Sequence, residues 1–118
     1  MPFKFEKLEI WQLAIEYTDM VHTLTKKFPK EEMFSLSSQF RRAADSISLN
    51  IAEGSIGQSD PEQAKFIGYA IRSLAECVTC LYLASKRNYI TESEFKTLYG
   101  KSEILIAKLN TFKKSLII

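Results

Sequence analysis

Apolar side chains recur with the helical period of about 3.6 residues in four successive segments of this sequence. The helices are expected over residues 7–26, 35–53, 60–86 and 91–116. The connections between them are short, so consecutive helices should run antiparallel. The pattern therefore predicts an all-α fold, an antiparallel up-down-up-down four-helix bundle that residues 1–118 form as a single domain.

Local signals mark the ends of these helices. Phe28-Pro29 ends the first, because proline disfavours the α conformation in the residue before it, and Gly54 is suited to end the second. Asp60 is expected to cap the third helix, and Thr91 with Glu94 forms a capping box for the fourth. Further expectations concern single residues: Ser35 or Ser37 as cap of the second helix, Phe34 tucked under the end of the bundle, Asn88 in a left-handed turn, and a close helix crossing at Gly100.

The composition is that of an ordinary soluble globular protein, with 46% apolar and 25% charged residues. A formal net charge of +2 indicates no particular class of partner. No secretory segment and no apolar run long enough to span a bilayer is recognised, so a cytoplasmic protein that does not enter a membrane is expected.

The residue types needed for catalysis or metal binding do not cluster. Cys77 and Cys80 form a C-x-x-C spacing, but it lies inside a helical pattern and no second Cys or His pair completes a zinc site. We expect two buried or half-buried thiols and no metal. His22 is the only histidine and has no nucleophile near it in sequence. The sequence therefore predicts no enzyme, no cofactor and no small-molecule substrate.

A polar stripe runs along the second helix, beside its apolar face. Two explanations remain open: a structural polar network that faces another helix or subunit, or a partly solvated face with ordinary hydrogen bonds. In the first, Arg42 pairs with Glu53 or Glu76. Arg72 and Glu76 can also pair at an i, i+4 spacing. The residues assigned to the network are Gln39, Arg42, Ser46, Asn50, Glu53 and Glu76.

Three large apolar residues lie outside the main apolar arcs of their helices. They are Trp11 and Ile15 in the first helix and Ile104 in the fourth. A large indole outside the main stripe is typical of an interface anchor, so these three are candidates for an oligomer interface. The alternative is that the first helix is covered on two sides by its own chain.

The run from Ser46 to Gly54 reads S-I-x-x-N-I-A-E-G. Further residues, spread over the chain, belong to the same pattern: Leu8, Trp11, Ala14, Phe28, Pro29, Phe34, Leu36, Gln39, Arg41, Arg42, Ala43, Ser73, Leu74 and Glu76. On these residues the chain resembles the 23S rRNA intervening-sequence proteins, small bacterial four-helix-bundle proteins related to the accessory protein of diversity-generating retroelements. The resemblance covers almost the whole chain, from about residue 5 to 116.

The resemblance implies a homopentameric barrel and an association with RNA. The basic residues assigned to nucleic-acid contact are Arg41, Lys65, Arg72, Lys113 and Lys114. Arg41 is expected on a more solvated side of the second helix than Arg42, which makes it the better contact. Phosphate contacts of this kind are independent of sequence and weaken with salt. No RNA-stacking motif of interleaved aromatic residues is recognised.

Two hypotheses of function follow. The first is a non-catalytic homo-oligomeric interaction protein that binds RNA or another nucleic acid through basic residues on the assembled barrel. The second is a protein-binding scaffold with no nucleic-acid role. A continuous basic band on the assembly favours the first, and a mixed charge pattern favours the second.

Overall fold

A computed structural model describes residues 2–57 and 59–117 of the chain. Throughout these residues the regular structure is helical, without strands. The four long helices are α1 (Glu9–Thr25), α2 (Leu36–Gly54), α3 (Asp60–Lys86) and α4 (Glu92–Leu116). Short 3₁₀ turns, Lys4–Lys7 and Lys30–Glu32, precede α1 and α2. The all-α prediction is confirmed.

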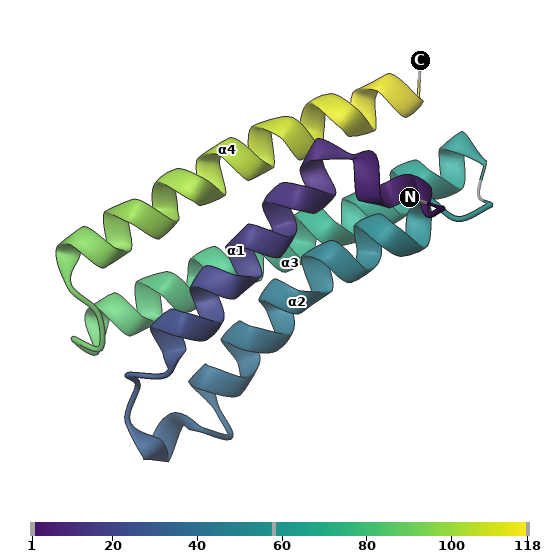
Figure 1. Ribbon diagram of the computed structural model, residues 1–118. Coiled ribbons are helices and arrows are strands. Elements are labelled where there is room, and N and C mark those ends of the chain that lie inside the picture. Colours follow the sequence, from purple (N-terminus) through teal and green to yellow (C-terminus); the bar gives the residue numbers. More distant parts are fainter. Residues whose placement is uncertain (1, 58, 118) are drawn as a thin grey trace.

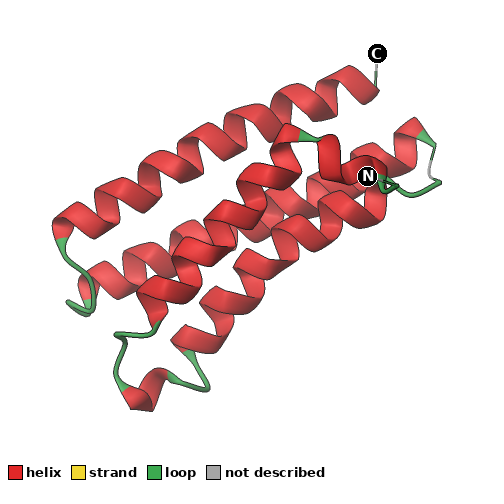
Figure 2. Ribbon diagram, viewed as in Figure 1, coloured by secondary structure: helices red, strands yellow, loops and turns green. Residues whose placement is uncertain are grey.

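The helices form an antiparallel ring in which neighbours in sequence are neighbours in space (Figure 1). Loops are confined to the two ends of the bundle (Figure 2). The most extensive contact is between α2 and α3, and α1 closes the ring against α4. This is the up-down-up-down arrangement that short connections favour.

The core is apolar and draws on all four helices. Its largest fully buried side chains are Tyr17, Val21, Phe40, Ile47, Ile51, Ile67, Leu74, Cys77, Leu81, Leu105 and Leu109. One polar pair lies among them: the Tyr17 hydroxyl is 2.8 Å from the Ser102 hydroxyl. Ser102 Oγ also donates to the Leu98 carbonyl at 2.9 Å. Since a serine hydroxyl has one proton, Tyr17 is the donor to Ser102, and this bond ties α1 to α4.

Several helix-end predictions hold and two are wrong. The capping box of Thr91 and Glu94 is present, and Asn88 has φ of 60°. The cap of α3 is Ser59 rather than Asp60, because Ser59 Oγ accepts from the Glu62 amide at 3.3 Å. Neither predicted serine caps α2 with its side chain.

The cap of α2 comes instead from the connector that precedes the helix. Glu32 Oε1 accepts from the Leu36 amide at 3.3 Å and from Ser35 Oγ at 2.6 Å. A carboxylate at a helix N-terminus also interacts favourably with the helix dipole. The side chain of Phe34 next to it is 92% exposed, so the expectation that it tucks under the bundle is wrong.

The glycines at 54 and 100 have opposite surroundings. A Cβ placed on Gly54 would lie 2.6 Å from Cβ of Phe66, so α2 approaches α3 too closely for any side chain. A Cβ on Gly100 would meet nothing within 4 Å. The predicted close crossing at Gly100 is therefore wrong, and the close approach lies at Gly54.

Both thiols are buried and free, as predicted. Burial raises the pKa of Cys80 to about 11 and raises the pKa of Cys77 further. Both thiols therefore stay protonated near neutral pH, and their thiolate character is low.

Among the described residues, one helix, α3, is long and apolar enough by length and composition to cross a membrane. The expectation that no run approaches such a length is corrected on this point. The signal is weak, because core helices of soluble proteins pass the same test. Here α3 packs Ile67, Leu74 and Leu81 into the bundle core.

Candidate nucleic-acid interface

The middle of the polar stripe forms a hydrogen-bonded network between α2 and α3. Asn50 Nδ2 donates to the Ser46 carbonyl at 2.8 Å and to Ser46 Oγ at 3.0 Å. Ser73 Oγ, from α3, lies 2.9 Å from Ser46 Oγ. All three side chains are half-buried. This part of the stripe holds two helices of the same chain together.

The ends of the stripe are solvated instead. Gln39, Arg42, Glu53 and Glu76 are exposed. Among the described residues no ion pair joins Arg42 to Glu53 or Glu76, and none joins Arg72 to Glu76. The predicted ion pairs are therefore absent from this structure.

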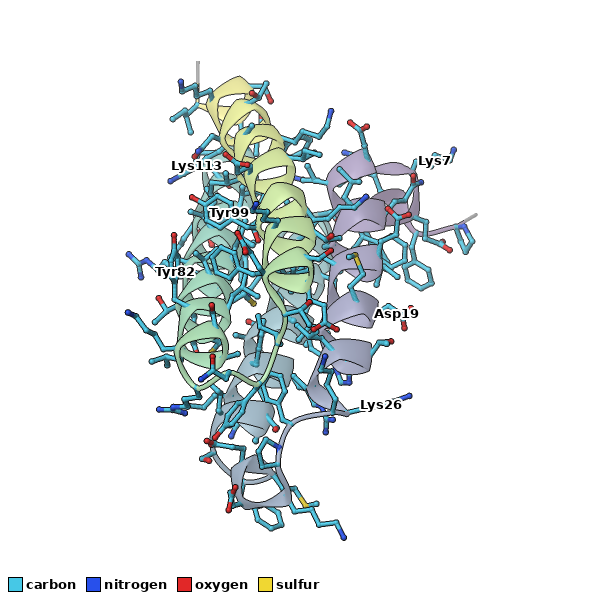
Figure 3. All side chains as sticks on the ribbon, turned by 90° about the vertical axis from the view of Figure 1, so that its left-hand side faces the viewer. Lys7, Asp19, Lys26, Tyr82, Tyr99 and Lys113 are labelled. Atoms are coloured by element: carbon cyan, nitrogen blue, oxygen red, sulfur yellow. The ribbon has the colours of Figure 1, made fainter. Side chains whose placement is uncertain are left out.

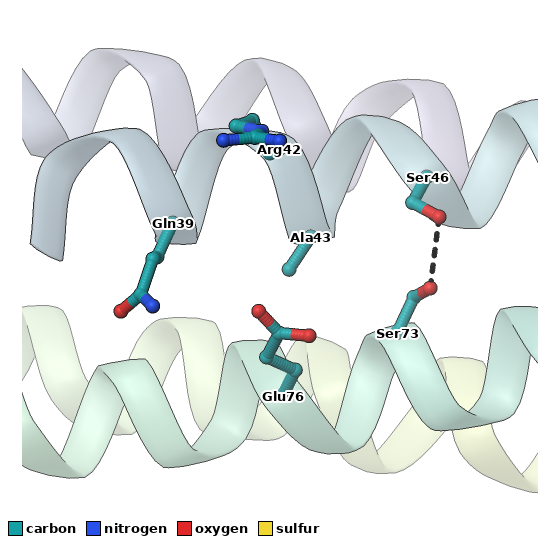
Figure 4. Close-up of a pocket in the computed structure, with 6 residues that line it drawn as sticks. All are labelled: Gln39, Arg42, Ala43, Ser46, Ser73 and Glu76. Atoms are coloured by element: carbon teal, nitrogen blue, oxygen red, sulfur yellow. Dashed lines mark hydrogen bonds between the residues drawn. The ribbon is translucent and has the colours of Figure 1, made fainter. Parts of the chain in front are cut away.

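An open hollow of about 420 Å³ lies over the network. It is lined by Gln39, Arg42, Ala43, Ser46, Ser73 and Glu76 (Figure 4). The Gln39 amide extends from α2 and the Glu76 carboxylate from α3 into the space between the two helices. Cationic, anionic and amide groups therefore line one hollow, which is a mixed surface rather than a site for a bare anion.

Three of the predicted basic residues come together at the edge between α3 and α4. Lys65 and Arg72 are exposed and two helical turns apart on α3, so they share one face. Gly68 lies between them, and Nζ of Lys113 from α4 reaches to 3.4 Å from where its Cβ would be. In the described part of the chain none of the three cations takes part in an ion pair. We call Lys65, Arg72 and Lys113 the basic edge.

Two aromatic rings lie beside the basic edge. Phe66 and Tyr69 pack edge to face, with ring centroids 5.4 Å apart. The guanidinium carbon of Arg72 is 6.0 Å from the centre of the Tyr69 ring. Sequence reasoning did not find this aromatic and basic cluster. The spacing i, i+1, i+4 and i+7 from Lys65 to Arg72 carries that signal within α3.

The other two nucleic-acid candidates lie differently. Arg41 is half-buried, and its Nε donates to Thr25 Oγ1 at 2.7 Å, which ties α2 to α1. The expectation that Arg41 faces a more solvated side than Arg42 is wrong, because α1 packs on the side of α2 from which Arg41 projects. Lys114 is exposed and follows Lys113 in the chain.

Of the three residues predicted for an oligomer interface, only two are exposed. Trp11 is half-buried, and its ring lies 5.1 Å from that of Phe5, so the chain's own N-terminal segment covers it. Ile15 and Ile104 are exposed on α1 and α4. Some apolar side chains are more exposed than these two, and the sequence did not mark them as interface candidates: Phe34, Leu49 and Ile56.

His22 belongs to a cluster that joins α1 to α2. Its Nε2 is 3.1 Å from Asp45 Oδ1, and Thr18 Oγ1 donates to the same oxygen at 2.6 Å. His22 and Asp45 are thus each engaged in an inter-helix contact.

Comparison with known proteins gives a family and a fold. Residues 6–111 match the family described as 23S rRNA-intervening sequence protein. A solved crystal structure of a protein of unknown function from the S23 ribosomal protein family of Bacteroides thetaiotaomicron VPI-5482 is similar to this chain, with a TM-score of 0.82 and 23% identity. The similarity covers 89% of this chain and 98% of that one. A comparison with curated proteins found no match. Since the family match extends over most of its residues, the chain belongs to the 23S rRNA-intervening sequence protein family.

Proposed function

We propose that this chain is a non-catalytic, self-associating protein that contacts nucleic acid through its basic edge. The observation that supports this most is the meeting of Lys65, Arg72 and Lys113 around Gly68, with no acidic partner for any of them among the described residues. Unpaired cations at this spacing suit phosphate oxygens. The description of the family, which refers to 23S rRNA, agrees with RNA as the nucleic acid.

The aromatic rings beside the basic edge suit contacts with nucleic-acid bases, in addition to the phosphate contacts of the cations. Tyr69 is half-buried and has the Arg72 guanidinium near its face. Aromatic and guanidinium planes are the groups on which unstacked bases pack in single-stranded RNA. The basic edge is bounded on α3 by Glu62 and Glu76, so one copy offers a contact about two to three helical turns long. Assembly into the homopentamer that the resemblance implies would repeat this contact, with the gain of multivalency.

The test measures fluorescence anisotropy of a labelled single-stranded RNA of about 20 nucleotides at about 50 and about 200 mM potassium chloride. The triple variant Lys65→Glu, Arg72→Glu, Lys113→Glu is compared with Lys4→Glu, Lys26→Glu, Lys101→Glu. The three control residues are exposed and, in the described chain, outside any ion pair. Each triple variant replaces three cations by three carboxylates, so both change the net charge equally.

We expect the basic-edge variant to bind at least about 10-fold more weakly than the control at low salt. Its logarithmic salt slope should be smaller by about 2, since each lost phosphate contact on a single strand removes about 0.7. Equal binding by the two variants would show that only net charge matters and would refute the basic edge.

A protein-binding scaffold is the second candidate. It is favoured by the mixed charges around Arg42 and Glu76 and by an apolar groove between α3 and α4. Native mass spectrometry at two ionic strengths, with bound nucleic acid followed by absorbance, separates the two. An oligomer that carries RNA at low salt and sheds it at high salt supports the first, and an oligomer free of RNA supports the second.

A further inference from the structure

The hollow over the α2–α3 network is lined by two opposite charges that do not pair with each other. Arg42 lines it from α2 and Glu76 from α3. Among its six lining residues, all of them described, the one hydrogen bond joins Ser46 to Ser73 (Figure 4). Within the described chain, neither Arg42 nor Glu76 belongs to an ion pair. The hollow therefore suits a ligand that offers acceptors to the guanidinium and donors to the carboxylate.

The size and the lining of the hollow suit a flat polar ring. Its volume of about 420 Å³ lies within the roughly 300–1,000 Å³ typical of small-molecule sites. Ala43 is its one apolar lining residue. The Gln39 amide and the hydroxyls of Ser46 and Ser73 are further hydrogen-bonding groups on its walls. A lining of this kind favours a heterocyclic base over a hydrocarbon group.

Among the four RNA bases, guanine alone can bond both charged groups through two atoms each. A guanidinium such as that of Arg42 donates to O6 and N7 of guanine as a bidentate pair. A carboxylate such as that of Glu76 can accept from N1–H and from the amino group at C2 on the Watson–Crick edge. Adenine instead pairs with an amide, for which Gln39 is available, and cytosine offers a carboxylate only its N4 amino group.

The hollow adjoins the basic edge along α3. Arg72 directly precedes Ser73 in the chain, and it precedes Glu76 by four residues, about 6 Å along the helix axis. Lys113 projects from α4 on the side where α3 lies (Figure 3). The basic edge thus has α4 on one side and the hollow, toward α2, on the other. A strand whose phosphates contact Lys113 and Arg72 can therefore place a neighbouring base in the hollow.

We infer that the hollow binds a guanine base of a single-stranded RNA whose phosphates contact the basic edge. The inference rests on the proposed function and adds the base that the strand carries at this point. Arg42 donates to O6 and N7 of the base, and Glu76 accepts from N1–H and from the amino group at C2. The basic edge then contributes affinity that is independent of sequence, and the hollow contributes the preference for one base.

The experiment measures fluorescence anisotropy of a labelled single-stranded RNA of about ten nucleotides, in which one central position is varied among uridines. This position carries guanosine, adenosine, cytidine or uridine. It also carries two analogues that each remove one contact: inosine lacks the amino group at C2, and 7-deazaguanosine lacks the N7 acceptor. Unlabelled guanosine monophosphate serves as a competitor that lacks the strand.

The full-length proteins compared are the wild type, Arg42→Met, Glu76→Ala and the control Glu62→Ala. Arg42 and Glu76 are exposed, so the core is left intact, and circular dichroism checks that each variant is helical. Glu62 is the matched control, because it is an exposed carboxylate that bounds the other end of the basic edge and does not line the hollow. Its removal changes the charge near the phosphates as the removal of Glu76 does.

The wild type should bind the guanosine RNA at least about 5-fold more tightly than the uridine RNA, as one bidentate pair with a base can provide. Inosine should weaken binding by the wild type, Arg42→Met and Glu62→Ala, and leave binding by Glu76→Ala nearly unchanged. 7-Deazaguanosine should weaken binding by the wild type and leave binding by Arg42→Met nearly unchanged. Each comparison is a ratio between two RNAs on one protein, so changes in phosphate contacts cancel.

The results that contradict the inference differ from those that contradict the proposed function. Equal binding of the guanosine and uridine RNAs by the wild type would overturn the guanine site and leave the basic edge in place. Absence of binding to every RNA would refute both. A preference for adenosine would overturn the guanine site in favour of a contact by Gln39. Guanosine monophosphate that competes as strongly as the RNA itself would show that a free nucleotide, rather than a strand, is the ligand.

Discussion

The Tyr89 hydroxyl donates a 2.7 Å hydrogen bond to Oε2 of Glu32, which joins the α3–α4 turn to the connector before α2. The same carboxylate accepts from Ser35, Leu36 and Arg87. Hydrogen bonds from Ser35 and Tyr89 lower the pKa of Glu32, and the bond to Glu32 raises the pKa of Tyr89. The folded chain therefore prefers Glu32 ionised and Tyr89 neutral.

Acid should weaken the fold through this carboxylate. Because the pKa of Glu32 is lower in the folded than in the unfolded chain, its contribution is present above the ordinary carboxyl pKa of 4.5 and is lost as pH falls through the lowered value. Denaturant unfolding measured from neutral to acidic pH should show this loss in the wild type and a shallower pH dependence in Glu32→Gln. The control is Glu31→Gln, an exposed neighbour. Equal pH dependence of Glu32→Gln and wild type would contradict the prediction.

Two glycine substitutions should change stability in opposite directions. Gly54→Ala forces a methyl group to 2.6 Å from Cβ of Phe66, so the α2–α3 contact must shift, at a cost of about 1–3 kcal/mol. Gly100→Ala meets no atom within 4 Å and should stabilise α4 by up to about 1 kcal/mol. The free energy of unfolding from urea titration measures both. A neutral Gly54→Ala would mean that the helices separate there without cost.

Removing either hydroxyl of the buried Tyr17–Ser102 pair should destabilise the fold, but by different amounts. Ser102→Ala leaves the Tyr17 proton without an acceptor in the core and should cost about 1–3 kcal/mol. Tyr17→Phe leaves Ser102 bonded to the Leu98 carbonyl and should cost about 0.5–1.5 kcal/mol. The double variant should be no less stable than Ser102→Ala alone, because no unpaired hydroxyl remains in it. The reverse order of the two single variants would show that Ser102 is the donor.

The two thiols should be protected by the fold. Because burial raises the pKa of Cys80 to about 11 and of Cys77 further, neither forms thiolate near neutral pH. A thiol reagent such as an aromatic disulfide should label both at once in denaturant and far more slowly in the native protein. The same shifts remove stability as pH rises above about 9, where the unfolded thiols ionise first. Fast native labelling would show that this part of α3 opens readily.

The helices could be predicted from sequence because periodicity is a property of each segment alone. Fourfold repetition of the apolar period identified α1 to α4 to within a few residues, and local capping chemistry identified the start of α4. The family resemblance is confirmed over residues 6–111. These features depend on short-range spacing, which a sequence displays directly.

Relationships between helices could not be predicted in the same way. Arg41 and Arg42 are about 100° apart on one helix, and which of them meets solvent depends on where α1 packs. The polar Glu32 is engaged and the apolar Phe34 is not: Arg87 and Tyr89, both from the distant α3–α4 turn, donate to Glu32, while Phe34 stays exposed. The approach of Lys113 to Gly68 depends on the register of α4 against α3, which no local pattern encodes.

The turn between α3 and α4 has a consequence for how the chain keeps its helices. Exchange of α4 between two copies, a domain swap, requires this turn to open into an extended linker. Asn88 at φ of 60° bends the chain sharply there, and the bond from Tyr89 to Glu32 fastens the turn to another part of the same chain. A swapped copy would have to break that bond and straighten the turn. The Glu32–Tyr89 contact thus favours a bundle closed by its own fourth helix over one completed by a neighbour's.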